Sequence, residues 1–573
     1  MKFSTFANYL SRIEGLDSRN EITELLGEMF SEAGSDEIKE MCYLVLGHLG
    51  PPHQRQEFGI SQKLLLRSIS LTSGKPENLV ATQMKAIGDI GDLTQNLLVD
   101  NKGDGLSVEQ VFESLLEIAI YSGEGSQELK ISGLADLLKS VDSLSARYIA
   151  RIPVKKLRLG FSDMTILDGL SWMLGGDKSH RKELERAFNV SADIGLIAQK
   201  VKGQGIESLK DITVTVGVPV RPAAAERLPT AEAIIEKLGT VSVEPKIDGF
   251  RLQMHFERGK MPHLYSRNLE DMSEMFPEIV DALSQLDVTS VVLEGEAVAF
   301  DPVTDKMLPF QETMQRRRKH NVEEKAKELP LKVFCFDILF FNGDSYLNVP
   351  YQKRREVLAE TVGDRSEALL VSNKTVISTA IKLSEYFDEQ IAKGLEGIMA
   401  KRLDSPYAAG SRNFNWIKLK REDTGDLNDT IDCVVMGYKA GKGRRNKFGI
   451  GAFLVGVYDS QEQKYKTISN VGTGLTDDQW KEMKLRADEL AVSQKPKEYE
   501  VPLGLEQDVW LDPQMVVEVL ADTITRSPNH TAGKVGDKPG YALRFPRLVQ
   551  WRDDKSPEQA TSVKEVRSMY KSG

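Results

Sequence analysis

The spacing of apolar residues over the first two hundred positions predicts helices. Five of them recur at three- and four-residue intervals, which places side chains on one face of a helix: Val108, Val111, Phe112, Leu115 and Leu116. Ser107 comes just before this run and Gln110 lies within it, and the two have the spacing of a helix-capping box. Similar stretches are interrupted at residues 74–76 and 123–125, where glycine and proline occur. We therefore expect an all-α domain over residues 1–214.

The pattern changes near residues 216–222. Short runs rich in β-branched and aromatic residues follow at 241–247, 291–300 and 332–341, and an amphipathic helical stretch occurs at 380–393. This mixture predicts an α+β domain over residues 215–420. Beyond it, runs at 431–438, 452–458 and 466–471 are separated by glycine-rich turns, which is typical of a small all-β barrel over residues 421–573.

Composition narrows the class of protein. The 573 residues are 40% hydrophobic and 28% charged, and no run of eighteen apolar residues occurs, so we expect no membrane span. Cys42, Cys335 and Cys433 are far apart, which excludes a four-cysteine zinc site and fits a reducing cytoplasm. The formal net charge is −10, yet basic residues cluster near 151–158, 316–319 and 439–447. Each cluster is either a solvated face or a contact for nucleic acid, and charge alone does not decide.

One short segment is a candidate for chemistry. Glu244, Lys246 and Asp248 occupy alternate positions, so along a strand they share one face, and Gly249 then permits a sharp turn. Burying such a row of charged side chains costs desolvation free energy, so its burial would indicate a functional role. The alternative is a charged strand at the edge of a sheet, because a lone K-x-D-G occurs by chance in roughly one chain in ten.

The same alternation recurs downstream. Glu294 and Glu296 share a strand face, as do Lys418 and Lys420, and a run from Glu396 to Lys401 again sets charge beside apolar residues. Each run alone is typical of a half-buried structural strand. Together they indicate a pocket lined by both signs of charge, which suits a nucleoside triphosphate with a metal ion. In such a pocket Lys246 is either a nucleophile, made neutral by nearby cations, or a permanently charged phosphate clamp.

The ordered set of motifs resembles the nucleotidyltransferase motifs of ATP-dependent DNA ligases of the archaeal and eukaryotic replicative type. The matching segments are Lys246-Ile-Asp-Gly-Phe-Arg251, Ser266-Arg-Asn-Leu-Glu270, Glu294-Gly-Glu-Ala-Val298, Phe334-Cys-Phe-Asp337, Glu396-Gly-Ile-Met-Ala-Lys401, Trp416-Ile-Lys-Leu-Lys420 and Arg544-Phe-Pro-Arg547. Gly217-Val-Pro-Val-Arg-Pro222 resembles the entry to the ligase catalytic domain, and Lys85-Ala-Ile-Gly-Asp-Ile-Gly91 resembles a segment of the helical domain.

The resemblance implies a role for each matching residue. Lys246 attacks the α-phosphate of ATP and holds AMP covalently. The other implied contacts are Glu244 and Phe336 with adenine, Arg251 and Arg267 with ribose and phosphate, Glu296 with ribose or metal, Glu396 with metal, Arg412 and Lys418 with the α-phosphate, and Lys420, Arg544 and Arg547 with pyrophosphate. The implied cofactors are ATP and Mg²⁺, the cation being held by one or two carboxylates and the phosphates.

The resemblance also implies a helical DNA-binding domain, an adenylation domain and an oligonucleotide-binding (OB) barrel, which encircle nicked duplex DNA during replication, repair and recombination. We expect a monomer. A sliding clamp is a further partner implied by relatives, but Gln95-Asn-Leu-Leu98 and residues 99–105 lack the paired aromatic residues of a clamp-binding peptide.

Three other functions share part of this sequence pattern. An mRNA-capping nucleotidyltransferase shares the lysine motif and the barrel but does not need the helical domain. An NAD-dependent ligase brings cysteine-rich zinc modules, which three scattered cysteines contradict. A non-catalytic, ligase-like scaffold that binds nicks is the alternative from another class. Against it, every charged position that the resemblance assigns to chemistry keeps its charge.

Overall fold

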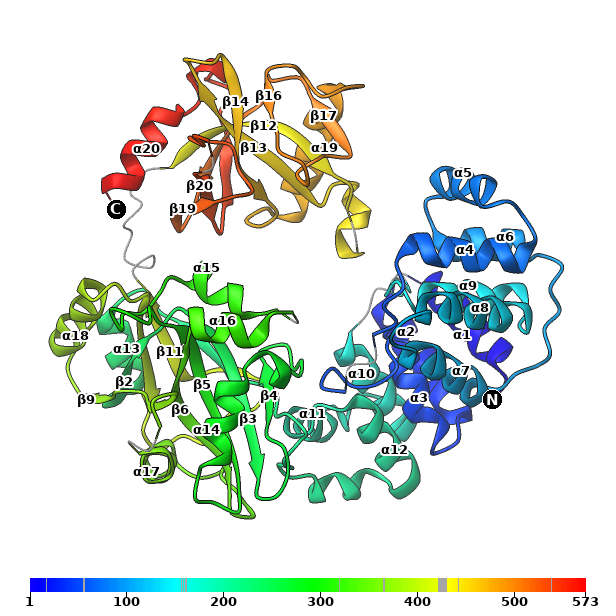
Figure 1. Cartoon of the computed structure of the whole chain (residues 1–573), viewed down its shortest axis with the longest axis horizontal. Coiled ribbons are helices and arrows are strands. Elements are labelled where there is room, and N and C mark those ends of the chain that lie inside the picture. Colours follow the sequence, from blue (N-terminus) through cyan, green and yellow to red (C-terminus); the bar gives the residue numbers. More distant parts are fainter. Residues whose placement is uncertain are drawn as a thin grey trace. The chain divides into compact units, whose positions relative to one another are not determined.

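The computed structural model describes residues 1–16, 18–54, 57–155, 157, 159, 162–318, 320–363, 366–420, 430–441, 443–536 and 538–572. The chain forms two compact units, Met1–Leu419 and Lys420–Gly573. Figure 1 shows the elements of each unit along the chain. The first unit contains a helical region, followed by a central region built on β-sheets, and the second unit is rich in β-strands.

The helical region is confirmed as predicted, because every named element in the described residues up to 211 is a helix. In order these are α1 (Phe3–Glu14), α2 (Arg19–Glu32), α3 (Glu37–Leu44), α4 (Gln62–Ser73), α5 (Glu77–Ile87), α6 (Ile90–Leu97), α7 (Val108–Ile120), α8 (Ser126–Lys139), α9 (Ser143–Arg151), α10 (Asp163–Gly175), α11 (Arg181–Val190), α12 (Ile194–Gln204) and the 3-10 turn η1 (Ile206–Asp211). The predicted capping box begins α7, since Ser107 and Gln110 each bond the other's backbone amide.

The segment Lys85–Gly91 forms a tight joint between helices α5 and α6. Gly88 adopts φ 76° and ends α5, and the Asp89 side chain caps α6 by accepting from the Asp92 amide at 2.8 Å. A Cβ at Gly91 would lie 2.4 Å from Nε of Arg151, so only glycine fits there. The side chain of Lys85 lies outside the described residues. The joint therefore positions α6 against α9.

Two residues of the predicted basic clusters are not surface cations at all. Arg151 is 0% exposed and forms ion pairs with Glu14, Asp89 and Asp92. Arg316 is 1% exposed and pairs with a carboxylate, at 2.6 Å from Glu278. For these two positions, both the solvated face and the nucleic-acid contact were wrong predictions, because each guanidinium group is buried and paired with carboxylates of its own region.

The structure describes only some of the other residues in the predicted basic clusters. Arg445 turns back into its own domain, donating to the Gly451 carbonyl at 2.6 Å and lying over the Trp480 ring. Lys447 is exposed and pairs with Asp477. Lys156, Arg158, Lys319, Lys442 and the side chain of Arg444 lie outside the described residues.

The central region contains two sheets. The first has the order β1-β11-β10-β2-β9, and the second has the order β4-β3-β5-β6-β7 with β8 paired to β6. The strands are β1 (Ala224–Arg227), β2 (Val241–Lys246), β3 (Phe250–Glu257), β4 (His263–Ser266), β5 (Ser290–Ala299), β6 (Leu331–Phe341), β7 (Asp344–Ser345), β8 (Leu369–Val371), β9 (Thr375–Ile377), β10 (Gly397–Arg402) and β11 (Arg412–Lys420). The three strand runs predicted here are confirmed as β2, β5 and β6.

The described central region also contains helical elements, some of which cover the apolar faces of the sheets. They are α13 (Ala231–Leu238), η2 (Ser273–Met275), α14 (Pro277–Ser284), α15 (Phe310–Thr313), η3 (Met314–Arg316), α16 (Val322–Glu328), α17 (Tyr351–Val362) and α18 (Ala380–Ala392). One core joins Ile234 of α13 and Leu383 of α18 to Val243 of β2. A second joins Ile279 of α14 to Leu293 of β5. Burial of these faces drives the packing, and the opposite faces of the same strands carry the charged residues.

The second unit is the predicted β-rich domain. Its strands are β12 (Ile431–Lys439), β13 (Ala452–Asp459), β14 (Lys464–Val471), β15 (Ala491–Val492), β16 (Tyr499–Glu500), β17 (Val509–Leu511), β18 (Val516–Leu520), β19 (Thr523–Ser527), β20 (Gly540–Arg544) and β21 (Arg547–Trp551). Its helices are η5 (Gly443–Phe448), α19 (Asp477–Glu489), η6 (Pro557–Gln559) and α20 (Val563–Ser572). The long strand β12 is buried from Ile431 to Tyr438 because its two faces pack into different cores, Cys433 into one and Val434 into the other.

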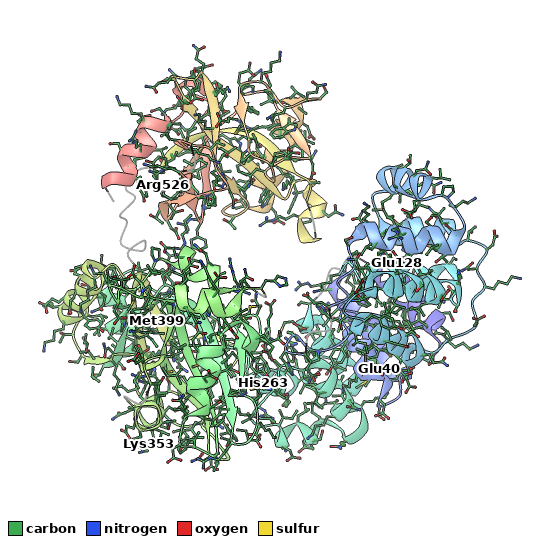
Figure 2. The ribbon with its side chains drawn as sticks, viewed as in Figure 1. Glu40, Glu128, His263, Lys353, Met399 and Arg526 are labelled. Atoms are coloured by element: carbon green, nitrogen blue, oxygen red, sulfur yellow. The ribbon has the colours of Figure 1, made fainter. Side chains whose placement is uncertain are left out.

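The last helix is attached to the strands by stacking. Arg526 of β19, labelled in Figure 2, lies 3.9 Å from the ring centroid of Tyr541, and its distance to the ring centroid of Tyr570 in α20 is 5.2 Å. Across the described chain, no helix combines the length and apolarity needed to cross a membrane. The three cysteines are buried as free thiols.

Candidate active site

Lys246 and Glu244 lie on β2, and each forms an ion pair with a residue of opposite charge at or just before β10 (Gly397–Arg402). In the antiparallel pairing of β2 and β10, Gly397 faces Lys246 and Met399 faces Glu244. The Lys246 ammonium forms an ion pair with Glu396, and the Lys401 ammonium lies 2.8 Å from Glu244. Two crossed ion pairs therefore hold the charged face of this strand pair.

The strand ends earlier than the sequence suggested. β2 stops at Lys246, and β3 begins at Phe250, so Asp248 lies in the turn and not on the strand face with Glu244 and Lys246. Gly249 takes part in this turn, where a Cβ would lie 2.3 Å from the Ala297 carbonyl oxygen. The expected row of three charged residues on one strand was therefore wrong by one member.

Glu244 is a buried carboxylate with several donors. It is 3% exposed, accepts from the Tyr351 hydroxyl and from Lys401, and lies 3.7 Å from Nε of Arg355. Lys401 is 1% exposed, and burial lowers its pKa although Glu244 opposes that effect. Such a carboxylate is held rigidly, since each oxygen already has a partner. Its implied contact with adenine stays a prediction.

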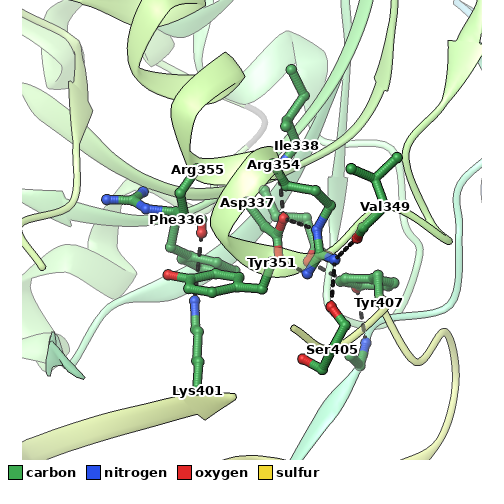
Figure 3. A network of polar contacts seen from close by, with 12 residues as sticks. Phe336, Asp337, Ile338, Val349, Tyr351, Arg354, Arg355, Lys401, Ser405 and Tyr407 are labelled. Atoms are coloured by element: carbon green, nitrogen blue, oxygen red, sulfur yellow. Dashed lines mark hydrogen bonds and ion pairs between the residues drawn. The ribbon is translucent and has the colours of Figure 1, made fainter. Parts of the chain in front are cut away.

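Aromatic rings surround the Lys401 ammonium. It lies 4.4 Å from the ring centroid of Trp416, 4.7 Å from that of Phe336 and 5.0 Å from that of Tyr351. Figure 3 shows Lys401 pointing at Phe336 and Tyr351, beside the network of Arg354. A flat, apolar surface above a cation suits a heteroaromatic base, which stacks on such rings.

Arg251 lies on the same side of the pocket. Its guanidinium lies 5.3 Å from the Phe336 centroid and 5.6 Å from that of Trp416. It donates to the Glu294 carboxylate at 2.6 Å and to the Tyr407 hydroxyl at 3.2 Å. Burial acts against its charge, but Glu294, Tyr407 and Glu296 together outweigh burial and keep the pKa of Arg251 above its usual value. Its buried Nε has no described partner, which leaves one donor for a ligand.

Glu296 faces Arg251 across β3 and β5 and lies in the field of Lys246. Burial raises its pKa to about 7, an effect that Lys246 and Arg251 oppose and that Asp248 and Glu396 reinforce. The described residues contain no cluster of three metal-ligating side chains. Magnesium needs no such cluster, because one or two carboxylates and substrate phosphates hold it. Glu296 and Glu396 fit that donor set.

Glu296→Gln is expected to stabilise the nucleotide-free protein above neutral pH. The folded-state pKa of about 7 exceeds the ordinary 4.5, so stability falls as pH rises from 4.5 to 7, and the loss persists above that range. Glutamine does not ionise, so the variant avoids this loss of about 3 kcal/mol in the free energy of unfolding at pH 8. Chemical unfolding without magnesium, compared at about pH 5 and pH 8, measures it. A difference between variants that does not change with pH would contradict the assignment.

The remaining predicted residues are placed as follows. Arg412 is exposed at the start of β11, and Lys418 and Lys420 follow on alternate positions of the same strand. Arg267 is exposed and lines a cavity of about 430 Å³ together with His48 and Pro51 of the helical region. Arg544 and Arg547 belong to the second compact unit, at the end of β20 and the start of β21.

Sequence reasoning did not single out several residues of the site. Tyr351 begins α17, and Tyr407 lies in the loop before β11, where its hydroxyl donates to Glu294 at 2.8 Å. Neither belongs to a periodic pattern of charge. Only their burial beside carboxylates marks them, and burial of a single loop tyrosine leaves no signal in one sequence.

Comparison with known proteins agrees with this geometry. Three family models match: "DNA ligase N terminus" over residues 2–171, "ATP dependent DNA ligase domain" over 222–420 and "ATP dependent DNA ligase C terminal region" over 446–555. The solved structure named Pmar-Lig_PreS3 is similar in fold, with a TM-score of 0.57 at 17% identity, covering 95% of this chain and 99% of the other.

Curated relatives are similar over their full length. A "Probable DNA ligase" of Dictyoglomus turgidum is 44% identical over 573 residues, covering 100% of this chain and 98% of the relative. A "DNA ligase" of Sulfurisphaera tokodaii is 38% identical over 590 residues, with the same coverage. The chain therefore belongs to the family of ATP-dependent DNA ligases, enzymes that join nicks in duplex DNA.

Proposed function

We propose that Lys246 is the nucleophile of this ligase. Its neutral amine attacks the α-phosphorus of ATP, a P–N bond forms, the bond to the β-phosphate oxygen breaks, and pyrophosphate leaves while the amine proton passes to water. The observation that carries this proposal is the position of Lys246, paired with Glu396 and within the field of Glu296. Those carboxylates hold the amine in place for in-line attack.

The two later steps return the enzyme to its starting state. An oxygen of the 5′-phosphate at the nick attacks the AMP phosphorus, the P–N bond breaks, and Lys246 regains a proton. The 3′-hydroxyl then attacks the 5′-phosphate, loses its proton to water and displaces AMP as the phosphodiester forms. Bound magnesium neutralises phosphate charge in this chemistry.

The other predicted residues have supporting roles in this proposal. Phe336 and Trp416 support stacking of the base, and Arg251 supports contact with ribose and phosphate, since its Nε is buried without a described partner. Glu244 would contact the adenine amino group, and Arg267 the phosphate. Arg412 and Lys418 would hold the α-phosphate. Lys420, Arg544 and Arg547 would assist the departure of pyrophosphate.

We further propose the division into a DNA-binding domain over 1–214, an adenylation domain over 215–420 and a barrel domain over 421–573. The family models and the two compact units support it. The free, buried thiols and the DNA substrate support action in the cytoplasm.

The first test is the intact mass of the protein after incubation with ATP and magnesium, repeated after nicked duplex DNA is added. We expect one AMP per chain, which the nicked DNA removes. An AMP that persists would favour capping or RNA-end chemistry. No adduct, and no mass change on treatment with pyrophosphate, would overturn the nucleophile and favour a nick-binding scaffold.

Arg547→Met is expected to slow AMP charging by about tenfold or more, while sealing of a pre-adenylylated nick changes by less than about threefold. The reason is that only charging releases pyrophosphate. Arg544→Met is expected to behave in the same way. Rapid-quench measurement of each step separates the two rates.

The matched control for Arg547→Met is Asp522→Asn. Asp522 is 6% exposed in its side chain and forms an ion pair with Arg547, so the control breaks the ion pair and keeps the arginine. If both variants slow the two steps equally, Arg547 only supports the barrel and its role with pyrophosphate is wrong.

A further inference from the structure

Residues 217–223, here termed the strap, connect the helical region to strand β1 of the central region. Alternate side chains of β3 bind its backbone: Arg251, Gln253 and His255. Their strap partners, in the same order, are the carbonyl of Ala223 at 2.7 Å, the amide of Val220 at 2.7 Å and the amide of Gly217 at 3.1 Å. Residues two apart on a strand share a face, so β3 presents one continuous row to the strap.

Gln253 lies at the centre of this row and uses its whole amide. It is 2% exposed. Its oxygen accepts from the amide of Val220 and from Nε2 of His255 at 3.0 Å, and its nitrogen donates to the Val220 carbonyl at 3.0 Å and to Glu294 at 3.2 Å. A buried amide with all four bonds made is fixed in orientation.

His255 fits the same arrangement only as a neutral ring. Nδ1 accepts from the Gly217 amide, so the proton is on Nε2, which donates to Gln253. His255 is 0% exposed, and burial lowers its pKa to about 3, with His263 and His53 acting in the same direction. The hydroxyl of Tyr265 adds a further bond to the strap, donating to the Gly217 carbonyl at 2.7 Å.

The row continues into the nucleotide site. Glu294 is 0% exposed and accepts from Gln253, from Arg251 at 2.6 Å and from Tyr407 at 2.8 Å. Tyr407 in turn accepts from the amide of Ala223 at 2.9 Å. Glu294 and the strap therefore hold the two ends of the Arg251 guanidinium, which lies beside the rings of Phe336 and Trp416.

We propose that Gln253 is a positioning residue for ATP binding, which acts through Glu294 and the strap to hold Arg251 at the nucleotide site. This inference rests on the proposed role of Arg251 toward the nucleotide. Gln253 itself contacts no reacting group. Its contribution is to fix one guanidinium geometry before ATP arrives, so its loss weakens ATP binding more than it slows the chemical step.

The test is single-turnover AMP charging of Gln253→Met as a function of ATP concentration. Methionine keeps the side-chain volume and removes every hydrogen bond that the Gln253 side-chain amide makes. We expect the half-saturating ATP concentration to rise about tenfold, with the maximal charging rate changed by less than about threefold. Gln253→Asn is the second variant, to be used if Gln253→Met folds poorly. Asparagine keeps an amide but is shorter by one carbon, so we expect a smaller rise in the half-saturating ATP concentration, again with little change in the maximal charging rate.

Two comparisons separate positioning from general weakening. Ile279→Ala disrupts the core under the same sheet without touching the strap, so it is expected to lower Tm without raising the half-saturating ATP concentration. Arg251→Met and the double variant Arg251→Met/Gln253→Met are expected to require similar ATP concentrations, because both residues act through one guanidinium.

Three results would overturn the proposal: a purely additive double variant, the same ATP shift in Ile279→Ala, or a fall in the maximal rate with unchanged ATP dependence. Failure of the ligase assignment itself would look different, since the unmodified protein would then form no AMP adduct.

Discussion

Lys246→Arg is expected to abolish AMP charging and leave binding of nicked DNA within about twofold of the unmodified protein. Arginine keeps the positive charge beside Glu396, so the ion pair and the fold of β2 persist. It is not deprotonated in proteins, however, and so provides no attacking lone pair. Loss of a covalent nucleophile costs on the order of a millionfold, which removes the adduct from detection.

Intact-mass measurement with ATP and magnesium checks the charging step, and fluorescence titration with nicked duplex checks DNA binding. Lys260→Arg is the matched control, since Lys260 is exposed in a turn and pairs only with its neighbour Glu257 among the described ion pairs. Full charging of Lys246→Arg would remove Lys246 from the mechanism. Charging lost from both variants would point to damage outside the site.

Arg354→Met is expected to lower the free energy of unfolding by about 3–5 kcal/mol. Arg354 and Asp337 are both 0% exposed, and their two hydrogen bonds measure 2.7 and 3.0 Å. Arg354 also donates to the carbonyls of Val349 at 2.6 Å and Ser405 at 3.0 Å (Figure 3). Without the guanidinium, the Asp337 carboxylate stays buried without its counter-charge, and two backbone carbonyls lose a donor.

Denaturant unfolding of the first compact unit within the full chain measures this loss. Adding Asp337→Asn to Arg354→Met is expected to recover part of it, because the neutral amide costs less to bury than the carboxylate. A loss below about 1 kcal/mol, or no recovery in the double variant, would show that the pair does not hold α17 to β6. Because Tyr351 of α17 donates to Glu244, we also expect charging to weaken with the fold.

The periodicity of the sequence was enough to predict elements and their class. The capping box before α7 and the β-rich runs at β2, β5 and β6 depend on bonds between residues close in the chain and on faces that alternate with a fixed period. Lys246, Glu296 and Glu396 could be predicted as candidates because charged side chains interrupt apolar strands. The structure places them close enough for Lys246 and Glu396 to shift the pKa of Glu296. The ordered motifs identified the family.

Partnerships across the fold were decided only by the tertiary structure. The sequence could not show that Arg151 and Arg316 are buried ion-pair partners, or that Asp248 leaves the strand at its end. It also gave no sign that Tyr351 and Lys401 both bind Glu244, or that Gln253 binds the strap. The physical reason is one of range: local patterns record which face of an element is apolar, whereas the partner of a buried charge or amide comes from a distant segment and is set by packing.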